Sequence, residues 1–438
     1  MLPENIESMI MRLNEAGFEA YAVGGCVRDM ILGLVPHDYD ICTSALPEQT
    51  INVFSEQRVI ETGFKHGTIT VISEGEPVEI TTFRTDGEYK DGRHPEAVSF
   101  TSDIADDLSR RDFTVNAMAY SKKTGVIDLF GGKEDLRNKI IRCVGEPKKR
   151  FEEDALRILR CLRFCSTYGF KCEEKTAKAI HDCNKLLKNV SAERIFAELQ
   201  RLLCGSCGYV LREFYDVFAE IIPEIYDAYG FRQYSRYHDR DVWEHIVSSV
   251  ESIPPVFHLR FAMLLHDLGK PSCCKMEDGV GHFKGHAAVS TSIARRAVEE
   301  LRCDSLNAEK ICFLVEKHDL PMTDDPKLIK RQLNKFGEEN YFDLLKVHIA
   351  DDMAKASHCR ERIKIYNNAC EIAKKIIAEN DCFSLKKLAV NGNDMINAGY
   401  SGAQIGKMLQ MLLEAVIDGK CANNRENLLK YLEYGEKE

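Results

Sequence analysis

The spacing of apolar residues along the chain changes near residue 150. Before this point, alternating apolar and polar positions predict strands over 19–23, 39–43, 64–72 and 78–83, after a short amphipathic helix over 5–17. From residue 151 onward, apolar residues recur every three or four positions, which is typical of helices, and no strong strand pattern follows. The pattern predicts an α+β fold with a mixed-sheet head and a long all-helical body.

Length, composition and charge narrow the picture further. The chain has 438 residues, so we expect two to four domains, and its 44% apolar and 29% charged content is ordinary for a globular protein. It contains no apolar run of about 18 residues and no basic, apolar leader, so we expect no membrane segment and a cytoplasmic location. A net charge of −10 argues against non-specific coating of nucleic acid, although residues 133–163 form a locally basic segment.

The most distinctive segment is a glycine turn followed by two closely spaced aspartates. Residues 24–29 read GGCVRD, and Asp38 and Asp40 follow with one residue between them. Glycine has no Cβ, so the backbone at Gly25 can approach a phosphate closely. Two carboxylates with this spacing on a strand point to one face, which suits Mg²⁺ ions that hold a nucleotide triphosphate. The alternative is an ordinary turn with solvated aspartates.

A second polar segment, residues 110–119, reads RRDFTVNAMA. Its adjacent arginines can hold triphosphate oxygens, with Arg111 as the candidate. Asp112 and Asn116 are four residues apart, so we expect them on one helical face. A surface charge cluster is the alternative.

Both segments resemble motifs of the class II tRNA nucleotidyltransferase and bacterial poly(A) polymerase family, within the DNA polymerase β-like superfamily. The resemblance implies that Asp38 and Asp40 bind catalytic Mg²⁺. Glu79 either completes that site as a third carboxylate or faces outward from its strand. The resemblance also implies contacts to the incoming nucleotide by Gly25, Arg28, Arg111, Asp112 and Asn116.

Residues 151–163, FEEDALRILRCLR, resemble the base-reading helix of the same family. A carboxylate accepts hydrogen bonds and a guanidinium donates them, so Asp154 and Arg157 on one helical face match the amine and ring nitrogen shared by cytosine and adenine. Guanine and uracil present the opposite pattern. Arg160 lies on the same face, and Glu193 and Arg194 would brace the pocket. The alternative is an exposed salt bridge.

Three further segments bear on the activity. Residues 84–98 resemble the flexible loop of family members that add the terminal A, or form an ordinary surface loop. Residues 128–132, DLFGG, resemble a hinge between head and neck, with a plain turn as the alternative. Residues 388–419 resemble helices that rest on the tRNA elbow, although an ordinary helix pair fits equally well.

The helical body carries histidines and aspartates in an order that resembles the HD phosphohydrolase family. The resemblance implies one divalent ion on four of them and a possible second ion beside two more histidines. Mixed nitrogen and oxygen ligands suit Mn²⁺, Ni²⁺, Co²⁺ or Fe²⁺. Asp352 competes with Asp351 for the last position, and His282 has no assigned role. The candidate ligands are His245, His266, Asp267 and Asp351 for the first ion, and His286 and His318 for the second.

Together these segments predict an enzyme that adds CCA to tRNA 3′ ends from CTP and ATP, with an HD phosphoesterase module. The alternatives are an A-adding tRNA nucleotidyltransferase, a poly(A) polymerase, or an HD phosphohydrolase whose head binds RNA. The sequence does not indicate an oligomeric state. The expected segments are a head over 1–145, a neck over 146–225, an HD domain over 226–370 and a tRNA-binding tail over 371–438.

Overall fold

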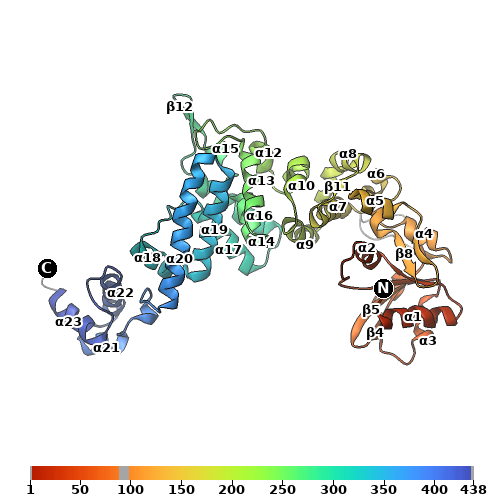
Figure 1. Cartoon of the computed structure of the whole chain (residues 1–438), viewed down its shortest axis with the longest axis horizontal. Helices are drawn as coiled ribbons and strands as arrows, with labels where there is room; N and C mark the ends of the chain where they lie inside the picture. The colour runs from red at the N-terminus through yellow and green to blue at the C-terminus, as the bar shows by residue number, and fades with distance from the viewer. Residues whose placement is uncertain (1, 88–97, 436–438) are drawn as a thin grey trace. The chain divides into compact units, whose positions relative to one another are not determined.

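The computed structural model describes residues 2–87 and 98–435 (Figure 1). The chain divides into two compact units. The first comprises Met1–Tyr226 with Glu300–Arg302, and the second comprises Asp227–Glu299 with Cys303–Glu438. This division falls beside the expected border between neck and HD segment. The finer division into four segments stays a prediction.

The head of the first unit is built on a seven-stranded sheet with the order β3-β4-β5-β2-β1-β8-β9. Strands β2 and β5 run parallel and the other neighbours run antiparallel, so the expectation of a mixed sheet is confirmed. The strands are β1 (Ala20–Val23), β2 (Asp40–Thr43), β3 (Val59–Ile60), β4 (Thr68–Ser73), β5 (Glu76–Thr82), β8 (Met118–Ser121) and β9 (Gly125–Asp128).

The local patterns explain most of these boundaries. In β4, every second residue is buried, as expected for a strand with one face on the core. The predicted helix over 5–17 is α1 (Glu4–Glu15), which buries Ile6, Met9 and Leu13. The predicted strand over 64–72 was too long, because Phe64–His66 forms a 3-10 turn that ends at Gly67 in the left-handed region.

Helix α5 (Gly132–Asn138) is the last helix of the head segment, and the helices of the neck follow it within the same unit. They include α6 (Pro147–Glu153), α7 (Leu156–Tyr168), α8 (Glu174–Cys183) and α9 (Ala192–Leu203). The prediction of an all-helical body is wrong in one respect here, since β11 (Lys171–Cys172) pairs in parallel with β10 (Ile140–Ile141). This pair is only two residues long on each side, too short to leave an alternating pattern in the sequence.

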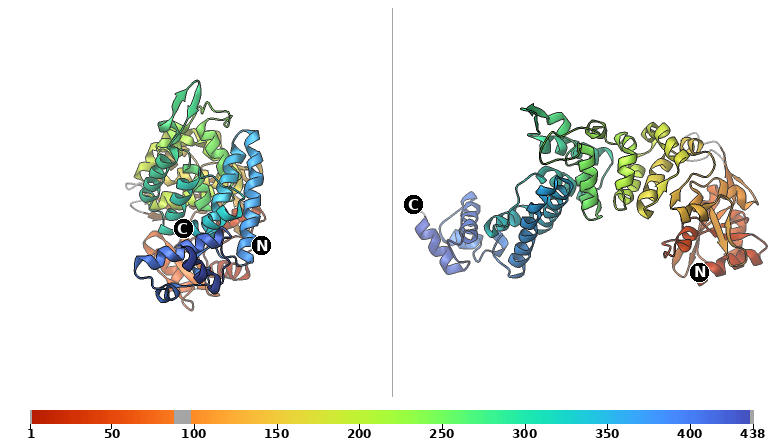
Figure 2. Two further views of the ribbon diagram at one scale, coloured as in Figure 1. Left: turned by 90° about the vertical axis from the view of Figure 1, so that its left-hand side faces the viewer. Right: turned by 45° about the horizontal axis from the view of Figure 1, so that its top comes forward.

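The second unit is helical except for one hairpin. Strands β12 (Lys275–Glu277) and β13 (Val280–His282) pair and project from the helices of this unit (Figure 2). The central helices are α13 (Val242–Ser252), α14 (Phe257–Leu265), α16 (His286–Glu300), α17 (Ser305–Lys317), α19 (Glu338–Ala354) and α20 (Ile363–Ala378).

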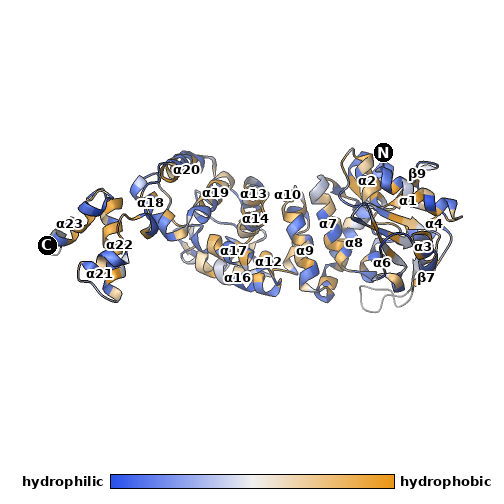
Figure 3. Cartoon of the chain, turned by 90° about the horizontal axis from the view of Figure 1, so that it is seen from below, coloured by the Kyte–Doolittle hydropathy of each residue, from blue (hydrophilic) through white to orange (hydrophobic). Residues whose placement is uncertain are grey.

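The end of the chain forms a small helical group with its own core. Helices α21 (Gly392–Asn397), α22 (Ala403–Ile417) and α23 (Arg425–Gly435) bury Met395, Leu412 and Leu428 against one another. Apolar and polar residues alternate along these helices, as the orange and blue stretches of α22 show (Figure 3). Over the part of the chain that the structure describes, no helix combines the length and apolar character needed to cross a membrane.

Candidate active sites in the head and the helical unit

The glycine turn connects β1 to α2 (Gly25–Ile31). Gly24 has a φ of 81° and its N–H donates to the Met118 carbonyl at 3.1 Å. A Cβ at this position would lie 3.0 Å from Nη1 of Arg111. The backbone angle favours glycine, and the tight contact shows that the turn lies against Arg111, so the predicted phosphate-binding residues Gly25 and Arg111 are close together.

Asp40 and Glu79 are direct partners in the parallel pairing of β2 and β5. Partners in register project to the same side of a sheet, so these carboxylates are neighbours. Asp38 precedes the strand, so the expectation that both aspartates stand on one strand is wrong. Burial of its surroundings, followed by the negative charges of Asp38 and Glu79, raises the pKa of Asp40 to about 6, although Asp40 keeps solvent access. Mutual repulsion of this kind suits a bound cation.

Arg111 is fixed by a carboxylate that the sequence analysis did not single out. Asp107, on α4 (Ile104–Ser109), is fully buried and accepts hydrogen bonds from Arg110 at 2.7 Å and Arg111 at 3.1 Å. Burial alone would raise the pKa of Asp107, but the two arginine charges lower it. The three- and four-residue spacing from Asp107 to the arginines was a usable signal.

Asp112 lies at the centre of a network between the head and α7. It accepts from Arg160 at 2.7 Å and from the Asn116 amide at 3.1 Å. Burial alone would raise its pKa, but the Arg160 charge and these hydrogen bonds lower it to about 2. No α-helix spans 112–116, so the expected helical face is wrong. A turn at Thr114–Asn116 brings Asn116 to Asp112 instead.

Arg28 extends this network to the glycine turn. Its guanidinium donates to the Asn116 side chain at 2.6 Å and forms a two-pronged pair with Asp29. The ring of Tyr168 on α7 lies 4.8 Å below the guanidinium, and its hydroxyl donates to Asp29. Segments 24–29, 110–116 and 157–168 therefore meet at one place, although they are far apart in the sequence.

The base-reading segment is not one continuous helix. Asp154 has an extended backbone between α6 and α7, and its side chain accepts from the Leu156 N–H at 3.1 Å and from Arg194 on α9 at 2.7 Å. Arg157 donates instead to Glu153 at 2.5 Å. The expected shared helical face is therefore wrong, because the helix restarts after Asp154. The predicted bracing contact is present for Arg194, whereas Glu193 pairs with Arg302.

The second site gathers all six predicted HD residues in the helical unit. Among residues 2–87 and 98–435, two groups of possible ligands have all their atoms within 4.8 Å of one another. Asp267 belongs to both groups, and Asp38, Asp40 and Glu79 form no such group. The first consists of His245, His266, Asp267 and Asp351, and the second consists of Asp267, His286 and His318.

The histidine tautomers in this cluster are set by backbone carbonyls. The Nδ1 atom of His266 lies 2.6 Å from the Met263 carbonyl, and that of His318 lies 2.7 Å from the Val315 carbonyl. The Nδ1 atom of His286 lies 2.9 Å from the carbonyl three residues before it. A carbonyl accepts only, so each of these Nδ1 atoms carries a proton, and each ring, when neutral, turns an Nε2 lone pair inward. The Nε2 atoms of His286 and His318 are 3.1 Å apart. Facing lone pairs beside carboxylates fit a divalent transition metal.

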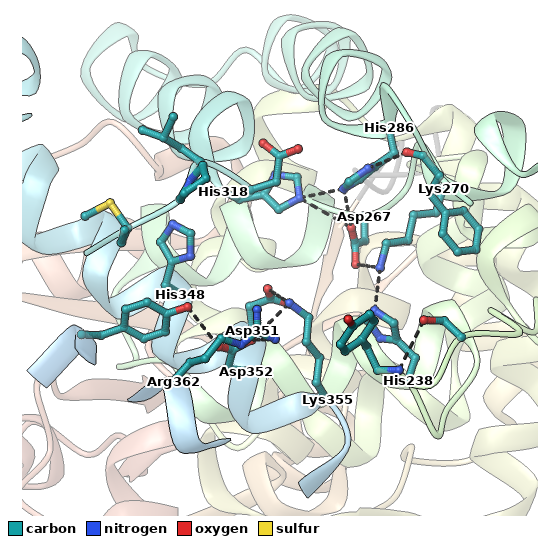
Figure 4. A pocket seen from close by; sticks show the side chains of 18 residues that line it. His238, Asp267, Lys270, His286, His318, His348, Asp351, Asp352, Lys355 and Arg362 are labelled. Atoms are coloured by element: carbon teal, nitrogen blue, oxygen red, sulfur yellow. Dashed lines mark hydrogen bonds and ion pairs between the residues drawn. The ribbon is translucent and has the colours of Figure 1, made fainter. Parts of the chain in front are cut away.

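The cluster forms one side of a cavity of about 520 Å³ (Figure 4). Asp352 lies outside the cluster and accepts from Tyr366 at 3.0 Å, which leaves Asp351 as the ligand candidate. His282 is exposed on β13. The sequence analysis did not single out several basic residues of this lining, of which Lys270 and Lys355 stand three and four residues after an acidic partner. They include Lys270, His348, Lys355 and Arg362.

Three sequence expectations gain little from the structure. The loop over 84–98 falls mostly on residues 88–97, outside the described residues. In the 128–132 segment, Asp128 accepts from the Gly132 N–H at 2.8 Å, and a Cβ at Gly132 would lie 2.4 Å from the Thr114 carbonyl. These contacts describe a packed turn, and the hinge stays a prediction, as does tRNA binding by the tail.

Three family models match the chain. They are the poly A polymerase head domain over residues 20–142, a probable RNA and SrmB-binding site of polymerase A over 169–227, and tRNA nucleotidyltransferase domain 2 (putative) over 286–432.

Individual relatives agree with these matches. A CCA-adding enzyme of Bacillus mycoides is 31% identical over 435 residues, covering 97% of both chains. A CCA-adding enzyme of Lactobacillus helveticus is 44% identical over 250 residues, and the match spans 61% of that relative's length. In the other relatives that match over part of the chain, the match spans about half to two thirds of the relative's length. The Bacillus stearothermophilus CCA-adding enzyme in complex with CTP has 28% identity and a TM-score of 0.69 over 100% of this chain and 98% of that one.

Proposed function

This chain belongs to the CCA-adding enzyme family, and we propose that it adds C, C and A to tRNA 3′ ends from CTP and ATP without a template. One observation carries the proposal. The Arg28–Asn116–Asp112–Arg160 network joins the glycine turn and the 110–116 segment to α7, and the charge of Arg111, from the same segment, acts on Asp40 of β2. A nucleotide bound there would have its phosphates at the sheet and its base at α7.

Asp38 and Asp40 would hold Mg²⁺, with Glu79 as a third oxygen donor. When bound, the ions would supply electrostatic stabilisation to the attacking tRNA hydroxyl and to the leaving pyrophosphate. Arg111, fixed by Asp107, would bind triphosphate oxygens. Arg28 is buried, whereas Arg111 is only half-buried, so we assign Arg28 to holding the Asn116 side chain toward the ribose. The bond to the α-phosphate forms as the bond to pyrophosphate breaks.

Base selection would come from Asp154 and Arg157. The Asp154 carboxylate accepts from an exocyclic amine, and the Arg157 guanidinium donates to an unprotonated ring nitrogen. The Arg157 N–H donates to the Asp154 carbonyl at 3.0 Å, so the two residues adjoin at the break before α7. Uracil and guanine would present a carbonyl to the Asp154 carboxylate and a ring N–H to the Arg157 guanidinium, and these mismatches cost about a few kcal/mol in a desolvated pocket.

The same fold would serve an A-adding enzyme or a poly(A) polymerase. A relative named for CCA addition, 31% identical over 97% of the chain, favours the full reaction. A head that only binds RNA would not need three neighbouring carboxylates, among which burial and the charges of Asp38 and Glu79 raise the pKa of Asp40, whereas a cation-binding catalytic site would.

We propose a second activity in the helical unit, the metal-dependent hydrolysis of a phosphate ester. The inward-facing Nε2 atoms, together with Asp267 and Asp351, would hold one or two divalent ions, namely Mn²⁺, Ni²⁺, Co²⁺ or Fe²⁺. When bound, such an ion would lower the pKa of a water molecule that it holds. Water would attack phosphorus, and the ester oxygen would leave as an alcohol. Such an activity would trim a phosphate from an RNA 3′ end, making the end extendable.

Extension of a tRNA transcript that ends at its discriminator base would test the main proposal. Purified protein would receive Mg²⁺ with CTP, ATP or both, and Asp38→Ala would serve as the control. Two C residues from CTP alone and a third residue only with ATP would support CCA addition. Addition of A only after CC would indicate an A-adding enzyme, and a long A ladder would indicate a poly(A) polymerase.

A further inference from the structure

One wall of the cavity beside the histidine cluster comes from α19, and of its residues only Asp351 belongs to the cluster. Helix α19 presents His348, Asp351 and Asp352, and Lys355 follows at its end, so that the four residues recur at the spacing of one helical face. Arg362, at the end of the following 3-10 helix (Ser357–Arg362), continues this wall. Figure 4 shows His348 and Arg362 on one side of the cavity, and His286 and Lys270 on the other.

The charges around the cavity favour an anion once a cation is bound. Three basic and four acidic side chains line it, giving a net charge of 3 − 4 = −1. One divalent cation at the cluster would change this to +1, and two would change it to +3. A phosphate group is the anion that both a cation and guanidinium groups bind well. The lining charges are Lys270, Lys355 and Arg362 against Asp267, Asp319, Asp351 and Asp352.

Arg362 is held in place yet remains accessible. Its side chain is 46% exposed and forms an ion pair with the buried Asp352 at 3.1 Å. Asp352 is itself fixed by the Tyr366 hydroxyl at 3.0 Å and by Lys355 at 3.3 Å. Because the guanidinium carries five N–H donors, one ion pair at its edge leaves capacity for a phosphate oxygen.

His348 lines the same wall and has an unsatisfied nitrogen. The residue is 7% exposed, and its Nε2 has no hydrogen-bond partner among the residues that the structure describes. Leaving a buried polar atom without a hydrogen bond is unfavourable, and the hydroxyl of a ligand could supply that bond. The Tyr366 ring, 5.4 Å away, holds the imidazole in its place. The apolar residues Leu320 and Met322 complete this end of the cavity.

We propose that Arg362 and His348 recognise the substrate of the helical unit, and that this substrate is the phosphate ester of a terminal ribonucleoside. Arg362 binds a phosphate oxygen on the side away from the histidine cluster. His348 forms a hydrogen bond with the ribose hydroxyl next to the phosphate. The inference rests on the proposed phosphoesterase activity and assigns the groups that distinguish a nucleotide from other phosphate esters.

Steady-state hydrolysis of two esters by the full chain loaded with Ni²⁺ would test the assignment. Adenosine 3′-monophosphate carries the ribose hydroxyl, and p-nitrophenyl phosphate does not. We expect His348→Ala to lower kcat/KM for the nucleotide about tenfold or more, mainly through KM, and to leave p-nitrophenyl phosphate within about twofold. His348→Gln, which keeps a polar atom near Nε2, should restore part of the loss. Arg362→Gln should raise KM for both esters.

Equal losses on both esters with His348→Ala would overturn the ribose contact, because a purely structural role does not distinguish them. Unchanged KM values with Arg362→Gln would overturn the phosphate contact. If the parent protein hydrolyses neither ester, the proposed phosphoesterase fails, and calorimetric binding of adenosine 3′-monophosphate decides the inference separately. Binding that Arg362→Gln and His348→Ala both weaken would support it, and absence of binding would overturn it. Unaltered CCA addition by each variant would verify folding.

Discussion

Asp40 illustrates how a proposed metal ligand can destabilise the protein that carries it. Burial of its surroundings and the charges of Asp38 and Glu79 raise its pKa from 3.8 to about 6. An aspartate whose pKa is raised on folding opposes folding when it ionises. The penalty is therefore absent at low pH, grows as the pH rises above 3.8 and is complete above about 6.

We therefore expect Asp40→Asn to raise the Tm of the metal-free protein at about pH 8, and to raise it less at about pH 5. Thermal unfolding in the presence of a chelator would measure both values. Glu79→Gln removes one of the repelling charges and should give a smaller rise with the same dependence on pH. An equal change in Tm at both pH values would contradict this origin of the pKa shift.

Asp154 supplies a second prediction at the scale of the residue. Asp154→Asn introduces an amide that both donates and accepts, so the base pocket no longer excludes uracil and guanine. We expect discrimination against UTP, as a ratio of kcat/KM values, to fall about tenfold or more. Glu152→Gln changes an exposed neighbour on α6 and serves as the matched control. Unchanged nucleotide preference in Asp154→Asn would argue against its role in base selection.

Between elements, one ion pair joins α7 to the head beside the contacts of Tyr168 with Arg28 and Asp29. Arg160 and Asp112 lie 2.7 Å apart, and Asp112 also fixes Asn116. Removing the carboxylate leaves enclosed donors unpaired, so Asp112→Ala should lower the free energy of unfolding by about 2 kcal/mol.

Urea unfolding of Asp112→Ala, Arg160→Ala and the double variant would measure the coupling between the two residues. Asp182→Ala breaks the solvent-exposed pair with Lys178 and should leave the free energy of unfolding nearly unchanged. Additive effects of the two single variants at Asp112 and Arg160 would show that the ion pair does not join the elements.

The elements differ in how far the sequence could specify them. Alternating apolar residues were enough for β4, and the resemblance to known motifs was enough to predict histidines and aspartates that lie together in the second unit. The break at Asp154 was not predictable in this way, because its cause is a contact with Arg194, 40 residues away along the chain. The wall of His348 and Arg362 was likewise missed, since an isolated histidine or arginine on a helix carries no spacing signal.

At the scale of the molecule, the two sites lie in separate compact units. The carboxylates of β2 and β5 and the residues of α7 belong to the first unit, and the histidine cluster belongs to the second. Each unit has its own core and its own set of possible ligands for metal ions. The two chemistries should therefore be separable by single substitutions, although both act on the 3′ end of RNA in the proposed function.

Two alanine substitutions test this independence. Asp40→Ala removes a carboxylate from the first site and should lower nucleotide addition about a hundredfold or more, while phosphoesterase activity stays within about twofold. Asp267 belongs to both ligand groups of the second site, so Asp267→Ala should lower phosphoesterase activity and leave nucleotide addition nearly unchanged. Primer extension with CTP and ATP, beside hydrolysis of a 3′-phosphorylated nucleotide, would measure both activities in each protein.

Asp267 is buried among the histidines and offers a ligand atom to both groups, so Asp267→Ala removes a carboxylate from each possible metal site. We therefore expect the variant to bind less Ni²⁺ in equilibrium dialysis. Loss of both activities from either substitution would mean that one site depends on the other, and the separate cores of the two units would then not account for the behaviour of the whole chain.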